Sequence, residues 1–256
     1  MTLEIPTPAP IGADRYPAAL RQAIQSLAIE EWEAFGRSVI DYRPVDKPLT
    51  KLARLENDPL VFDRLVRYWS ALGPFWAPFV DEQTAWRDAG RTDLWAREPW
   101  SAAFISWVMR AAGIGRGDFQ FSASHWRYID FAMAAERALG DRALYQPLDA
   151  DAVVPQVGDL ICGDRSEAGK PHLVRIADRA AEAGKKRKLH CDLVVGRTAD
   201  AILAIGGNLA DSVALCHYPA RPDGRLVTDP AQRRDHRTLF GLLRCRLRGT
   251  AQPLEL

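Results

Sequence analysis

The spacing of apolar residues changes once along this chain of 256 residues, and the change limits the folds open to it. Before about Pro155, apolar residues recur every three or four positions, as they do on one side of an amphipathic helix. After Pro155 they form short runs bounded by glycine and aspartate, which is typical of strands. All eight tryptophans lie in the helical part, between Trp32 and Trp126. The pattern therefore predicts an α+β domain, with helices packed on a small antiparallel sheet.

Four helices are expected in the first part of the chain. Their apolar stripes cover residues 20–35, 60–73, 99–112 and 122–140. Leu20, Ile24 and Leu27 illustrate the stripe of the first helix. Residues 41–58 read as a connector that contains prolines. We expect residues 1–57 to form a helical lead-in and residues 58–256 the α+β domain, the two making one compact unit.

Five strands are expected in the second part. They cover residues 158–162, 190–196, 201–207, 211–218 and 239–247. Residues 163–189 are mostly polar and read as a long loop. The sequence "GRTAD" reads as a compact turn that joins the second of these strands to the third in a hairpin.

Several functional classes receive no support from the composition. A formal net charge of +1 gives no electrostatic argument for binding nucleic acid or an acidic membrane. The apolar runs are too short to span a membrane, and the N-terminus shows no secretory signal. We therefore expect synthesis as a cytoplasmic protein. The four cysteines form no CxxC pair, and GxGxxG, P-loop and HExxH motifs are absent, so no metal or cofactor is expected.

Ser101 stands at the start of the third predicted helix, just after Pro99, a residue suited to a first helical turn. Serine is common at such positions for structural reasons alone. The helix N-terminus also offers unpaired backbone N–H groups and the positive end of the helix dipole, which stabilise an oxyanion. Ser101 is thus either a helix-start residue or a nucleophile.

The predicted hairpin supplies the partners that a nucleophile needs. A turn about Thr198 would place His190 opposite Gly206, and His190, Asp192 and Asn208 would share one face of the sheet. An imidazole beside an amide or a carboxylate is the arrangement of a general base with its orienting group. Asp192 lies among apolar residues, where a carboxylate needs a partner; that partner is either a neighbouring arginine or His190.

These residues resemble known motifs. "WSAAFISWVMRAAG" (residues 100–113) is similar to the nucleophile helix of the CHAP and NlpC/P60 peptidoglycan amidases and endopeptidases, which have a papain-like fold. The resemblance implies Ser101 as nucleophile, His190 as base and Asn208 as the group that orients the base. The chain departs from those families in carrying serine where they carry cysteine. A hydroxyl, unlike a thiol, needs a base at the moment of attack.

A closer resemblance is to the DUF2272 family of bacterial proteins, and it extends from about Ala23 to the C-terminus. The similar segments are "PWSAAFISW", "FSASHWRYI", "GDLIC", "HCDLVV" and "IGGNLADSV". In the resembling fold Cys162 and Cys191 lie on neighbouring strands. They are buried thiols in a reducing cytosol, or a disulfide after export.

The resemblance to the hydrolases implies cleavage of amide bonds in peptidoglycan or a related peptide by Ser101, His190 and either Asn208 or Asp192. Two alternatives remain: a binding or scaffold module without catalysis, and an acyltransferase using the same site. The side chains expected to line a substrate groove are those of Trp100, Ser122, His125 and Trp126. His125 also fits a satisfied core residue. A chain without a signal peptide would suit a phage lysin or a secretion-system toxin delivered to the periplasm, and a toxin would imply an immunity protein.

Overall fold

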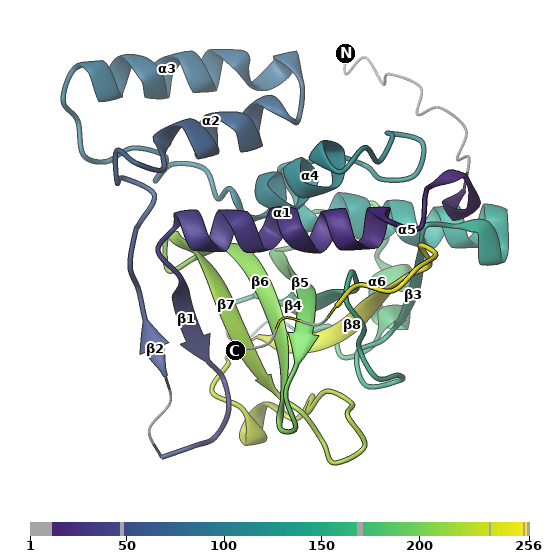
Figure 1. The fold of residues 1–256 in the computed structure, drawn as a ribbon. Helices are drawn as coiled ribbons and strands as arrows, with labels where there is room; N and C mark the ends of the chain where they lie inside the picture. Colours follow the sequence, from purple (N-terminus) through teal and green to yellow (C-terminus); the bar gives the residue numbers. More distant parts are fainter. Residues whose placement is uncertain (1–11, 47–48, 168–170, 236, 253, 255–256) are drawn as a thin grey trace.

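The computed structural model describes residues 12–46, 49–167, 171–235, 237–252 and 254. Within these residues the chain forms six α-helices and one eight-stranded sheet (Figure 1). The α+β class expected from the sequence is confirmed. The N-terminal segment, on which the expectation of no signal peptide depends, lies largely outside the described residues.

Four helices fall where the apolar stripes place them: α1 (Leu20–Ala34), α2 (Phe62–Ser70), α4 (Ser101–Ala111) and α5 (His125–Leu139). Helix α4 begins at Ser101 rather than Pro99, because Trp100 is its N-cap residue. Two further helices, α3 (Ala77–Asp88) and α6 (Ile176–Ala181), were not predicted. Helix α3 buries only Phe79 and Gln83, so it carries almost no apolar stripe to recognise.

The five predicted strands are also present: β4 (Leu160–Asp164), β5 (Leu189–Arg197), β6 (Ala201–Leu209), β7 (Ser212–Pro219) and β8 (Thr238–Cys245). Three strands were missed: β1 (Ser38–Asp41), β2 (Thr50–Lys51) and β3 (Tyr145–Asp149). The sheet order is β2-β1-β7-β6-β5-β4-β8-β3. The expectation of a small antiparallel sheet is wrong, since β1 pairs in parallel with β7 and the sheet is mixed.

The described part of the N-terminal region, residues 12–46 and 49–57, is built into the same core as the rest of the chain. Helix α1 packs against α4 and against strands β5, β6 and β7. Strand β1 extends the sheet along β7, and β2 forms its edge. This region therefore adds strands to the sheet as well as the predicted helix.

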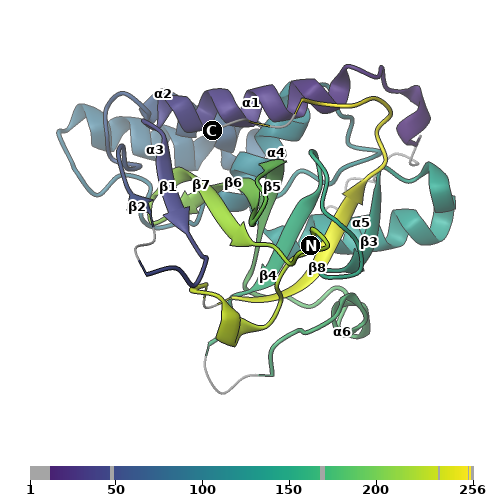
Figure 2. The same ribbon diagram turned by 60° about the horizontal axis from the view of Figure 1, so that its bottom comes forward.

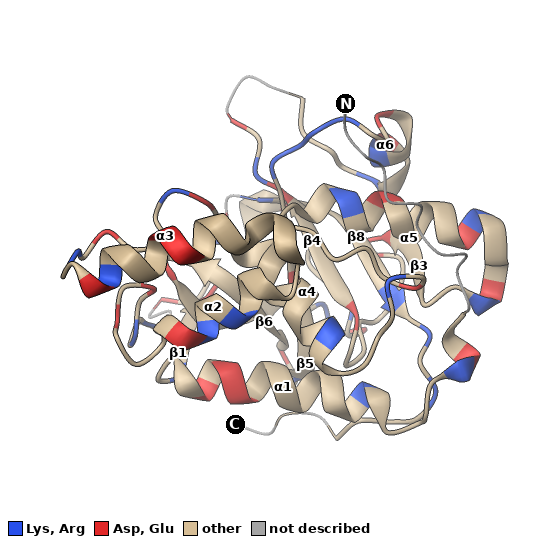
Figure 3. Cartoon of the chain, turned by 90° about the horizontal axis from the view of Figure 1, so that it is seen from above, with Lys and Arg blue, Asp and Glu red and all other residues tan. Residues whose placement is uncertain are grey.

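The sheet has two buried faces. Helices α1, α4 and α5 cover one face, where they form the larger apolar cluster with Leu193, Leu203 and Leu215 (Figure 1). The other face carries a smaller apolar cluster around Val194 and Tyr218. In Figure 2 helix α1 lies above the sheet and α6 lies below it. Acidic and basic residues are interspersed over α1, α2 and α3 (Figure 3). None of the helices in the described residues is long and apolar enough to cross a membrane.

Candidate functional site

The N-terminus of α4 lies directly against strand β6, and this contact positions Ser101. A Cβ atom added at Gly207 would lie 2.7 Å from Phe104 Cβ and 2.8 Å from an atom of the Trp100 ring. Only glycine therefore lets the helix approach so closely. The Ser101 side chain is held inside the protein, and the residue is 4% exposed.

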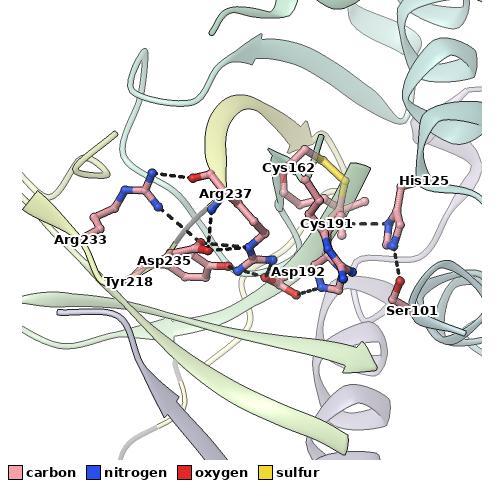
Figure 4. Close-up of polar contacts among 12 residues, drawn as sticks. Ser101, His125, Cys162, Cys191, Asp192, Tyr218, Arg233, Asp235 and Arg237 are labelled. Carbon is pink, nitrogen blue, oxygen red and sulfur yellow. Dashed lines mark hydrogen bonds and ion pairs between the residues drawn. A yellow bond between two sulfur atoms is a disulfide. The ribbon is translucent and has the colours of Figure 1, made fainter. Parts of the chain in front are cut away.

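The hydroxyl of Ser101 is bonded to His125, the first residue of α5. Ser101 Oγ and His125 Nε2 are 2.6 Å apart (Figure 4). The other ring nitrogen, Nδ1, accepts a hydrogen bond from the backbone N–H of Cys191 at 3.1 Å and also contacts the Tyr128 hydroxyl. Because Nδ1 is an acceptor, a neutral His125 carries its proton on Nε2 and donates it to Ser101. Burial, together with nearby His190, holds the pKa of His125 well below its usual value, so the ring is neutral.

The second imidazole, His190 on β5, is the same tautomer as His125, with its proton on Nε2 and its lone pair on Nδ1. His190 Nε2 donates to Asp192 Oδ1 at 2.8 Å, and both residues are fully buried. Its Nδ1 lies 3.5 Å from Arg165 Nη1, which can only donate, so Nδ1 keeps its lone pair. Burial lowers the pKa of His190 although Asp192 opposes the shift. His190 is thus a neutral imidazole whose Nδ1 lone pair faces Arg165, and its ring centre lies 4.9 Å from that of His125.

Asp192 is the ionised centre of a buried network (Figure 4). Its Oδ2 accepts from Arg237 Nη1 at 3.0 Å and from the Tyr218 hydroxyl. Arg237 is bonded in turn through Nε to Asp235 at 3.0 Å. Burial alone would raise the pKa of Asp192, but His190 and Arg237 hold it far below its usual range. The carboxylate therefore stays charged and fixes the tautomer and direction of the His190 ring.

The hairpin register differs from the predicted one by two residues. Arg197 pairs with Ile202, so the turn lies beyond Thr198, and a bulge between Val194 and Gly196 then brings Leu193 opposite Ile205. Continuing the pairing from Leu193 brings Asp192, not His190, opposite Gly206. A Cβ at Gly206 would lie 1.8 Å from Asp192 Oδ1, so glycine makes room for the carboxylate.

Asp192 rather than Asn208 orients His190. Asn208 has a left-handed backbone, with φ of 54°. With its amide oxygen turned toward the available donors, it accepts from Trp100 Nε1 at 2.8 Å and from the Trp100 backbone N–H at 3.3 Å. The side chain thus fastens the start of α4 to the end of β6, and Asn208 contributes to the site by positioning Trp100.

A cavity of about 210 Å³ opens beside His190. Its lining residues come from strand ends and loops: Tyr42, Arg165, His190, Asn208, Leu209, Ala210, Arg234, Asp235 and Arg237. Nδ1 of His190, which accepts a long hydrogen bond from Arg165, is the one basic nitrogen with a lone pair among these side chains. The cavity is where a substrate could meet the imidazole–carboxylate pair.

The four side chains expected to line a substrate groove lie elsewhere. Trp100 is fully buried between Phe35 and Tyr68, and its indole N–H donates to Glu56 at 2.6 Å. The Ser122 hydroxyl accepts from the Ser124 backbone. The Trp126 ring is half-buried beneath the guanidinium groups of Arg127 and Arg179. His125, the fourth, is bonded to Ser101, and none of the four lines the cavity beside His190.

Cys162 and Cys191 are direct cross-strand partners on β4 and β5, as the resemblance implied. Their Cα atoms are 4.2 Å apart and their sulfur atoms are joined in a disulfide (Figure 4). The bridge lies on the helix-facing side of the sheet, and the N–H of Cys191 sets the tautomer of His125. Cys216 and Cys245 are free and buried.

The sequence reasoning missed the polar residues around Asp192. It recognised that a carboxylate within an apolar strand needs a histidine or arginine partner, and Asp192 has both. Arg237 and Tyr218 were not identified, because Tyr218 lies on β7 and Arg237 directly precedes β8, and no local pattern reveals the register of these strands against β5. In the described part of the chain no group of three histidine, cysteine, aspartate or glutamate residues is arranged to hold a metal ion.

Residues 56–245 match the DUF2272 family, which is described as an uncharacterized protein conserved in bacteria. The chain belongs to this family. The DUF2272 segment contains Ser101, both imidazoles, Asp192 and Arg237, whereas α1, β1 and β2 precede it. Neither the curated proteins nor the solved structures contain a significant match to the chain.

Proposed function

We propose that this protein hydrolyses amide bonds in peptidoglycan or a related peptide. The observation that carries the proposal is the buried pair His190–Asp192, whose imidazole lines a cavity and lies 4.9 Å, ring centre to ring centre, from His125, the hydrogen-bond partner of Ser101. A neutral imidazole held by an ionised carboxylate is the arrangement of a general base. Such a cluster of perturbed titratable groups beside a cavity is typical of catalytic sites.

We assign different roles to the two imidazoles, because His125 contacts Ser101 whereas His190 lines the cavity. Ser101 accepts from His125, so its own hydroxyl proton is free to go to another acceptor. In the proposed reaction Ser101 Oγ attacks the amide carbonyl carbon while its proton passes to His190 Nδ1, directly or through one water. His190 then gives that proton to the departing amine nitrogen. Water then attacks the carbonyl carbon of the acyl-serine ester and gives one proton to His190. The bond between that carbon and Ser101 Oγ breaks, the carboxylic acid leaves, and His190 returns the proton to Oγ.

His125 acts in this scheme as a donor. The Nε2–H of His125 and the first-turn N–H groups of α4 stabilise negative charge as it develops on Ser101 Oγ. The same order of serine helix and histidine strand supports a papain-like relationship, with serine in place of cysteine. Transfer of the acyl group to an amine instead of water would use the same steps.

The disulfide supports the location proposed for the substrate. Structural disulfides persist in the periplasm and outside the cell, where peptidoglycan is found, and are rare in the cytosol. Delivery by a phage or a secretion system, with an immunity protein in the producing cell, is consistent with this location.

One observation favours a second candidate, a binding module without catalysis. Ser101, His125 and His190 are nearly or fully buried, so the cavity could bind a ligand that never reaches the serine. The two functions differ in whether product forms, which makes them separable by experiment.

The test is release of muropeptides from purified peptidoglycan, followed by mass spectrometry. Wild-type protein should release peptides, whereas Ser101→Ala should be inactive and retain its unfolding transition. Ser101→Cys is the matched variant and should retain or exceed wild-type activity, because a thiol ionises more readily. If wild type and Ser101→Cys are both folded and inert on peptidoglycan, peptide and ester substrates, the binding module replaces the hydrolase.

A further inference from the structure

The cavity beside His190 has an excess of positive charge. Arg165, Arg234 and Arg237 line it, and Asp235 is the carboxylate among its lining residues. Arg237 is already paired with Asp192 and Asp235. The other two arginines of the cavity, Arg165 and Arg234, form no ion pair with Asp192 or Asp235.

Arg165 and Arg234 make hydrogen bonds to neutral groups. Arg165 Nη1 points at His190 Nδ1 from 3.5 Å, and Arg234 Nη2 donates to the Val45 carbonyl at 2.7 Å. Neither guanidinium forms an ion pair with a carboxylate within the described ranges, and both side chains are exposed. Most of their donor N–H groups thus remain available to a ligand.

We propose that Arg165 and Arg234 bind a carboxylate of the substrate, and that the substrate is a peptide cut close to its free C-terminus. This inference rests on the proposed hydrolase function. A guanidinium presents its N–H groups in a planar fork that matches the two oxygens of a carboxylate. The peptide terminus is the carboxylate that an amide hydrolase meets next to its scissile bond.

The cavity is small, so a terminal carboxylate bound in it would lie close to the amide bond that is cut. Its volume of about 210 Å³ is below the roughly 300–1,000 Å³ typical of pockets for larger ligands, so it suits one small terminal group. His190 lines the same cavity, and its Nδ1 lies beside Arg165. A carboxylate held by the two arginines therefore leaves the adjacent amide within reach of the base.

The inference is tested by binding, which is separate from turnover. In the Ser101→Ala background, an N-acetylated dipeptide with a free C-terminal carboxylate and its C-terminal amide are titrated by calorimetry. The free acid should bind at least about tenfold more tightly, as expected for loss of one charge-assisted contact. Arg165→Gln and Arg234→Gln should each weaken binding of the acid by about tenfold and leave binding of the amide unchanged. Arg137→Gln, at an exposed position on α5, is the matched control and should bind as the parent does.

The outcomes separate this inference from the proposed function. Equal affinity for acid and amide, or wild-type affinity in both arginine variants, would overturn the carboxylate site even if muropeptides are released. Displacement of the peptide by inorganic phosphate but not by acetate would also overturn it, since the site would then be a phosphate site. Selective binding of the acid without any cleavage would support the carboxylate site and refute the hydrolase.

Discussion

Replacing Gly206 with alanine should collapse the network that orients His190. Gly206 lies within β6 and has an ordinary backbone conformation, so alanine brings no conformational strain. Its Cβ would lie 1.8 Å from Asp192 Oδ1, and ordinary contact requires at least 3.4 Å. The carboxylate must therefore move, and it cannot do so while bonded to His190, Tyr218 and Arg237.

The expected loss in the free energy of unfolding comes from the buried charge that loses its partner when the carboxylate moves. Removing one partner of a buried ion pair lowers the free energy of unfolding by about 3–5 kcal/mol, because the other charge stays buried without compensation. A glycine-to-alanine change at an unstrained, roomy position would instead stabilise the protein by about 0.4–1 kcal/mol. Gly241→Ala on β8 is the matched control, because its Cβ would meet the terminal methyl of Ile176 at 3.2 Å, a group that can shift.

The assay is equilibrium unfolding in urea of both variants and of the double variant Gly206→Ala/Asp192→Ala. Removing the carboxylate removes the clash, so the two substitutions should be non-additive by at least about 2 kcal/mol. The reasoning is refuted if Gly206→Ala is no less stable than Gly241→Ala, or if the double variant is simply additive.

Three further outcomes follow. Burial raises the pKa of Glu56 from 4.5 to about 7, so the folded protein loses stability as the pH rises between these values. The variant Glu56→Gln keeps an acceptor for Trp100 without a titrating group. In urea titrations it should be about 1–2 kcal/mol more stable than wild type at pH 8 and equal to it at pH 4. The disulfide between Cys162 and Cys191 closes a loop with a sequence separation of 29, so reductant should lower the free energy of unfolding by about 3–4 kcal/mol, and alkylation with mass spectrometry should detect the linked peptides before reduction. Ser101→Cys should react with iodoacetamide faster than the buried thiols of the folded protein, and equal rates would argue against an activated position.

Much of the fold could be predicted because the helices and central strands have strong local patterns. Helix α1 and strands β5 to β7 coincide with their predicted ranges within a few residues. The parallel strand β1 could not be found, because its four residues follow directly on the first predicted helix and are too few to carry a signal of their own. Its pairing with β7 depends on a contact distant in sequence.

The candidate site could be predicted in part. The need of a buried carboxylate for partners indicated an arginine or His190 beside Asp192, and Asp192 contacts both His190 and Arg237. The turn lies later than predicted, since Arg197 pairs with Ile202, and the one-residue bulge near Val195 reverses part of that shift. As a result Asp192 lies opposite Gly206, and Asn208 lies beside Trp100. The hydrogen bond between Ser101 and His125 joins two helix starts, and neither helix alone predicts how they meet.

The central claim is that His190 removes the proton from Ser101 while His125 only donates to it. The most direct measurement compares kcat/KM for muropeptide release by His125→Gln and His190→Gln. The glutamine amide can still donate to Ser101 from position 125, but it cannot act as a base at position 190. The account predicts that His125→Gln stays within about tenfold of wild type and that His190→Gln loses roughly 10²–10⁴-fold. The opposite order, with His125→Gln inactive and His190→Gln active, would contradict it.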